Sequence, residues 1–82
     1  MSERLMMEGS LQRKKMHSME LATRAAGLIR SLKIIIQPAA ITPLADLRTG
    51  EALALMQDLH EVRIEYFQVI SEMEEIRKEL KG

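Results

Sequence analysis

Hydrophobic residues between positions 49 and 81 recur at alternating spacings of three and four without a break. This is the period of an α-helix with one apolar stripe, and a strict seven-residue repeat predicts a second helix packed along that stripe. Thr49 is expected to cap the helix at its start, and Gly82 follows its end. The expected packing positions, a and d of the heptad, are Ala52, Leu55, Leu59, Val62, Tyr66, Val69, Met73, Ile76 and Leu80.

A second helical period precedes the first, from about residue 10 to residue 36. Ser10 is the expected N-cap, and Pro38 disfavours helical dihedrals at Gln37, so the helix should end near Ile36. The β-branched run Ile34–Ile36 alone would favour a strand, but it continues the helical period. The expected stripe is Leu11, Ser18, Ala22, Ala25, Ile29, Leu32 and Ile36, with Leu21, Leu28 and Ile35 beside it.

The remaining segments complete a helical hairpin. Residues 1–9 show no clear period and are expected to form a flexible arm. Residues 37–48 connect the helices, and Ile41, Leu44 and Leu47 recur at every third position, which predicts a short turn over the end of the hairpin. We therefore expect an all-α antiparallel hairpin forming a single domain over residues 10–82.

Side-chain volume suggests how the two helices meet. If small residues face large ones, residues whose numbers sum to about 88 lie side by side. The apolar match fails beyond Lys15, so the hairpin should loosen there and leave residues 73–80 free for a partner. The expected pairs are Ala22 with Tyr66, Ala26 with Val62, Ile29 with Leu59, and Met19 with Val69.

Charge is balanced overall but divided between the two halves of the chain. Twelve basic and twelve acidic side chains give no net charge, yet residues 1–40 hold seven Lys or Arg against three Glu, and residues 41–82 hold five against nine acids. The halves therefore carry net charges of +4 and −4. We expect the antiparallel helices to attract each other, although a basic arm for an acidic partner is an alternative.

Size and composition favour self-association. A chain of 82 residues buries a small core, and without cysteine or a Cys/His cluster it has no disulfide or structural metal to stabilise it. Leu53, Met56, Phe67 and Ile70 add a second apolar stripe to the long helix, which one partner helix cannot cover. We expect a homo-oligomer, a helical bundle or coiled coil, with a dimeric four-helix bundle as the simplest form.

No pattern of catalytic chemistry stands out. His60, Glu61 and Glu65 lack the second histidine that a helical zinc site needs, because position 64 is isoleucine. We therefore expect no enzyme activity, cofactor, metal or small-molecule substrate. Tyr66 and Phe67 are expected to pack rather than to bind a ligand. The expected packing and interface residues are Leu55, Leu59, Val62, Tyr66, Phe67, Val69, Met73, Ile76 and Leu80.

Hydropathy indicates no membrane association. The longest uncharged run, residues 34–45, has 12 residues and two prolines, against the roughly 20 apolar residues that a spanning helix requires. The first nine residues contain two glutamates and no apolar segment typical of a secretory signal. The expected location is the cytoplasm.

These features favour a non-enzymatic protein-interaction module: a small assembly, adaptor or chaperone-like protein that binds itself and another protein through helix–helix contacts. The alternative is a small nucleic-acid-binding regulator, because Arg13, Lys14 and Lys15 form the one concentrated basic run. The run lacks interleaved aromatic residues, and three consecutive helical positions spread around the helix rather than along one side.

Chromatography on heparin or duplex DNA separates the two functions. A regulator should be retained, with retention that falls steeply with salt and vanishes when Arg13, Lys14 and Lys15 are replaced by alanine, because phosphate contacts release counterions. For the interaction module we expect no such retention, and no effect of the triple substitution on elution. Salt-dependent retention of the unmodified chain would contradict that expectation.

Overall fold

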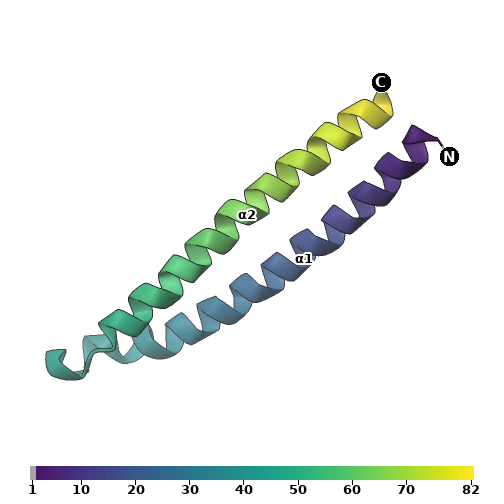
Figure 1. The fold of residues 1–82 in the computed structure, drawn as a ribbon. Coiled ribbons are helices and arrows are strands. Elements are labelled where there is room, and N and C mark those ends of the chain that lie inside the picture. The colour runs from purple at the N-terminus through teal and green to yellow at the C-terminus, as the bar shows by residue number, and fades with distance from the viewer. Residues whose placement is uncertain (1) are drawn as a thin grey trace.

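The computed structural model describes residues 2–82 as two long antiparallel helices, so the predicted all-α hairpin is confirmed (Figure 1). Helix α1 (Glu3–Ile36) and helix α2 (Thr49–Lys81) lie side by side along their whole length. Two 3₁₀ turns, η1 (Gln37–Ala40) and η2 (Leu44–Asp46), form the connection at one end. Both termini lie at the other end.

Helix α1 begins earlier than the sequence suggested. The Ser2 hydroxyl caps the helix by accepting a hydrogen bond from the Leu5 backbone N–H at 3.2 Å, and Glu3 lies in the first turn, where its charge favours the helix dipole. The helix continues through Gly9 and does not start at Ser10. Residues 3–9, expected as a separate arm, are therefore part of α1. Its end at Ile36, before Pro38, is as expected.

Helix α2 begins at Thr49, but Thr49 is not the cap. Arg48 occupies the N-cap position, and its side chain does not bond to the helix backbone. Its guanidinium instead donates hydrogen bonds of 2.7 and 2.8 Å to the two carboxylate oxygens of Glu51. This bidentate pair holds an acidic side chain in the first turn of α2, where it interacts favourably with the helix dipole.

The core is one line of side chains between α1 and α2. Buried Leu21, Val62, Val69 and Met73 form its centre, and half-buried apolar residues pack against them. Buried Ser18 adds a hydroxyl that donates to the Lys15 carbonyl at 2.7 Å, so its polar group is satisfied within its own helix. The α1 side of this line consists of Leu11, Lys14, Ser18, Leu21, Ala25, Leu28, Leu32 and Ile35, which again alternate at spacings of three and four.

The register is close to the expected one, but α1 is turned about its axis by one residue position. Ile35 lies beside Ala52 near the turn, and the stretch 21–29 lies beside 59–66, so neighbouring residue numbers sum to about 87. Leucines contact α2, whereas the expected contact residues Ala22 and Ala26 are exposed. The leucines take the contact because burying a leucine side chain removes more apolar area from water than burying an alanine side chain. Met19 and Ile29, also expected in contact, are 62% and 41% exposed.

The end of the hairpin opposite the turn was expected to loosen, but the two helices stay packed together there. The additional N-terminal turns of α1 lie alongside the end of α2, and Met73 is only 3% exposed. The Arg4 guanidinium donates a hydrogen bond of 3.1 Å to the Leu80 carbonyl, one of the last carbonyls of α2. Residues 73–80 are therefore not left free, because the first turns of α1, from residues 3–9 on to Leu11, lie alongside them.

The turn does not cover the opposite end as expected. Ile41 and Leu44 are 89% and 83% exposed, and only Leu47 is half-buried, near Ile35 and Ala52. The Thr42 hydroxyl donates to the Pro38 carbonyl at 2.7 Å and closes η1. Two of the three periodic apolar residues of the connection thus face outward.

The hairpin is long and thin. It measures 63 × 15 × 14 Å and has a radius of gyration of 18.6 Å, whereas a compact domain of this length has about 12 Å. Its exposed surface is 6508 Å², against about 5,000 Å² for a compact protein of 9.4 kDa. Among residues 2–82, no side chain is less than 2% exposed. One line of contact between two helices leaves most of each helix in water.

Substitution of Val62 tests the line of core side chains between α1 and α2, which we call the contact line. Replacing Val62 by Asp would place an unpaired carboxylate in the centre of the core, so we expect the free energy of unfolding to fall by about 2–5 kcal/mol. Chemical denaturation followed by circular dichroism measures the change. The matched control is Ile64→Asp, at a 52% exposed position of the same helix, which should cost far less. Equal losses in the two variants would contradict the arrangement of α2.

Candidate interaction surface

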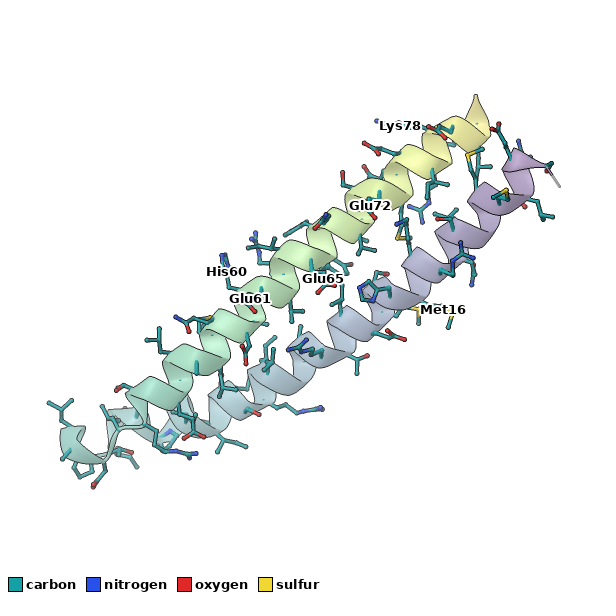
Figure 2. All side chains as sticks on the ribbon, in the orientation of Figure 1. Met16, His60, Glu61, Glu65, Glu72 and Lys78 are labelled. Carbon is teal, nitrogen blue, oxygen red and sulfur yellow. The ribbon has the colours of Figure 1, made fainter. Side chains whose placement is uncertain are left out.

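The contact line divides the hairpin into two sides of different chemistry, and one side is polar. Here Lys14 Nζ lies 2.6 Å from Glu72 Oε2, and His17 Nε2 lies 3.0 Å from Glu65 Oε1. In Figure 2, Glu65 and Glu72 lie on the part of α2 that faces α1, whereas His60 points away from the hairpin. We call this side the polar face. It joins the basic helix to the acidic one.

His17 has the clearest electrostatic environment on the polar face. Its hydrogen bond with Glu65 and, secondarily, its pairing with Glu20 at 3.7 Å raise the pKa of His17 above the usual 6.5, against a smaller opposing effect of desolvation. The ring thus bridges α1 to α2 most strongly when it is protonated. This contact is a pH-dependent link between the helices.

The other side of the contact line carries a shallow apolar groove. Ala22, Ala26 and Ile29 of α1 line it on one side, and Arg63 and Tyr66 of α2 are among its residues on the other. Leu21, Ala25, Leu59 and Val62 of the core complete the lining. The groove exists because the alanines are too short to fill the space between the helices.

Exposed apolar residues extend this groove along both helices. Met19 lies one turn from Ala22 on α1, and Ile36 lies two turns beyond Ile29, so both share the groove's side. On α2, apolar residues at helical spacings of three and four before and after Arg63 extend the groove in the same way. We call the whole surface the apolar face: Met19, Ala22, Ala26, Ile29 and Ile36 of α1 with Leu53, Met56, Arg63, Phe67 and Ile70 of α2.

Arg63 lies at the middle of the apolar face, and exposed His60 and Lys33 have the same helical spacing within it. Its guanidinium carbon lies 4.7 Å from the centre of the Phe67 ring, a cation–π contact. The Tyr66 and Phe67 rings meet edge to face with centres 6.1 Å apart. These contacts hold the Phe67 ring beside the groove, and the aliphatic part of Arg63 can cover apolar surface while its charged end stays in water.

Most of the sequence-predicted packing residues lie on the contact line within one chain. Val62, Val69 and Met73 are buried there, and Leu55, Leu59, Tyr66, Ile76 and Leu80 are half-buried. Phe67 departs from the expected packing because it is 53% exposed and belongs to the apolar face. The chain's own first helix therefore occupies the stripe that seemed to await a partner.

The three basic candidates do not share one surface. Lys14 is half-buried and paired with Glu72, while Arg13 and Lys15 are exposed. Consecutive helical residues point about 100° apart, so Arg13 and Lys15 lie on opposite sides of Lys14. The structure does not bring the run Arg13–Lys15 together as one basic patch.

Sequence reasoning identified two neighbouring apolar stripes on α1 but chose the wrong one for the contact with α2. The leucine stripe packs on α2, and the neighbouring stripe through Met19, Ala22, Ala26 and Ile29 stays exposed. Residue size was the available signal, since the larger side chains take the contact. Ile34 and Ile64 are exposed singly outside both faces, as is common on protein surfaces, whereas Met16 lies beside Met19 at the edge of the apolar face.

Residues 2–82 include no group of three or more His, Asp or Glu side chains placed to hold a metal ion. Neither described helix is long and apolar enough to cross a membrane. No family model, curated protein or solved structure matches this chain. The apolar face is therefore the feature from which a function can be argued.

Titration of His17 tests the polar face. We expect Glu65→Gln to lower the pKa of His17, measured by NMR, because it removes the larger of the two carboxylate contacts. Since the folded pKa is raised, the stabilisation is complete below pH 6.5 and is lost as pH rises through the folded pKa. The control is Glu61→Gln, which removes an exposed acid of the same helix. An unchanged pKa in Glu65→Gln would contradict the bridge.

Proposed function

We propose that this chain is a non-enzymatic protein-interaction module, a small assembly, adaptor or chaperone-like protein that binds another helical surface through its apolar face. The observation that carries the proposal is the continuity of that face across both helices. Met19, Ile36, Leu53 and Phe67 are all more than half exposed on it. A connected apolar surface with charged surroundings is typical of protein-binding sites.

The shape of the apolar face suits a helix. A groove between two parallel ridges of side chains accepts an amphipathic helix, whose residues at i, i+3, i+4 and i+7 enter it. Ala22 and Ala26 line the groove, so a partner helix can approach the backbone of α1 closely. Phe67 and Arg63 beside them are of the residue types that most often carry binding energy.

No specific observation favours the nucleic-acid alternative. Glu72 already compensates the charge of Lys14, and Arg13 and Lys15 point to different sides of α1. The aromatic residues lie beside Arg63 on α2, well away from this run. A protein partner is the proposal that uses the largest exposed feature of the hairpin.

Co-purification from the cells that make the protein tests the proposed function. We compare the tagged chain with Phe67→Glu, which places a negative charge on the apolar face, and with Gln68→Glu, the same change in charge at the next, exposed position. Proteins identified by mass spectrometry should be recovered with the unmodified chain and with Gln68→Glu, and lost with Phe67→Glu. Circular dichroism should show both variants fully helical, because neither position is buried.

Equal recovery with the two variants would contradict a role for the apolar face. Recovery of no protein, not even further copies of the untagged chain, would contradict the proposed function as a whole.

A further inference from the structure

We infer that the apolar face binds a second copy of this chain, with the two hairpins packed face to face and their turns at the same end, as a four-helix bundle. This inference rests on the proposed function and names its partner. Three properties of the hairpin support it: the amount of surface left exposed, the opposite charges of α1 and α2, and the sizes of the side chains along the face.

The excess exposed surface of the hairpin is more than one dimer contact of ordinary size removes. The hairpin exposes 6508 Å², about 1,500 Å² more than a compact protein of its mass. A stable interface of ordinary size buries roughly 800 Å² on each partner. Packing a second hairpin on the apolar face would cover exposed Met19, Ile36, Leu53 and Phe67, and it would give a chain without any fully enclosed side chain among residues 2–82 a true interior.

Charge selects the orientation of the second copy. Helix α1 holds seven basic and three acidic residues, a net charge of +4, and α2 holds four basic and eight acidic residues, a net charge of −4. With the turns at the same end, α1 packs on α2 of the second copy. With the turns at opposite ends, α1 packs on α1 and α2 on α2. The first arrangement brings opposite charges together.

Side-chain size agrees with the same orientation. Because residues at one level of the hairpin have numbers that sum to about 87, Met19 would lie level with Phe67 of the second copy. The alanines at 22 and 26 would lie level with its Arg63, so the smallest residues of the face would receive a long one. Lys15 would lie near the level of its Glu74, which extends the charge match.

The opposite orientation places like charges together. The apolar residues of α2 run from Leu53 to Ile70, with Phe67 among them. If the opposite orientation is centred on these residues, its two-fold axis passes near residue 62. Arg63 would then approach Arg63 of the second copy within an apolar contact, where a buried charge without a partner is costly. The two α1 helices, each with a net charge of +4, would also lie side by side.

The experiment uses the full purified chain, which contains no cysteine of its own. Sedimentation equilibrium should give twice the 9.4 kDa chain mass for the unmodified chain and for Gln68→Glu, and 9.4 kDa for Phe67→Glu. To determine the orientation, Met19→Cys and Phe67→Cys chains are mixed and oxidised. A mixed disulfide between the two should predominate, because only the turns-together arrangement places these positions across the interface. The control mixture pairs Met19→Cys with Glu61→Cys, on the polar side of α2, and should not form a mixed bridge.

Each other outcome overturns the inference. A dimer in which Met19→Cys and Phe67→Cys form no mixed disulfide would show that the two turns do not lie at the same end. A dimer that survives Phe67→Glu would use another surface. A monomer that remains free, or that binds vesicles of anionic lipid, would show that a second copy is not the occupant. These results leave the co-purification test standing, because that test asks only whether a protein partner in the cell depends on Phe67.

Discussion

The structure depends on a single line of contact between two antiparallel helices. Each helix contributes about two residues in every seven to that line, and the centre is formed by Leu21 and Val62 with Val69 and Met73. The remaining positions of both helices stay in water, whatever their chemistry. Every other property of the hairpin follows from which residues take part in this contact and which are left beside it.

The residues left beside the contact line are sorted by chemistry. On one side, Lys14 pairs with Glu72 and His17 with Glu65, so two pairs of opposite charge join the helices within the chain. On the other side, the apolar face has no partner in the chain and carries Arg63 as its central charge. One side of the hairpin therefore has ion pairs within the chain, and the apolar side is the one through which the hairpin can associate.

The sequence was sufficient for the fold because its strongest signals are local. The unbroken spacing of residues 49–81 and the effect of Pro38 determine where the helices lie and where α1 ends. Its weaker signals gave a wrong start for α1. Gly9 lowers the stability of a helix by only about 1 kcal/mol, which is too little to outweigh the cap at Ser2. That cap is itself a local signal, and the bond from Arg4 to the distant Leu80 adds support that no local pattern records.

The candidate surface was less predictable than the fold. The second stripe of α2, through Leu53, Met56 and Phe67, is visible in the sequence, and so are both stripes of α1, but the sequence does not show which stripe of α1 packs on α2. Two stripes one position apart compete for the contact in α1, and the choice depends on the packed volume of leucine against alanine. A pattern of spacings does not contain that comparison, so Ala22 and Met19 were placed in the core instead of on the surface.

The contacts between α1 and α2 close loops of very different lengths, and this difference gives the hairpin an order of assembly. Near the turn, Ile35 and Ala52 meet after closing a short loop, whereas the bond from Arg4 to Leu80 joins residues 76 positions apart. Loop-closure entropy grows slowly with length, so each contact formed near the turn brings the next pair into reach at little further cost. The chain can therefore close like a zipper from Ile36 towards Ser2. In this order, the contacts nearest the chain ends, such as the bond from Arg4 to Leu80, form last.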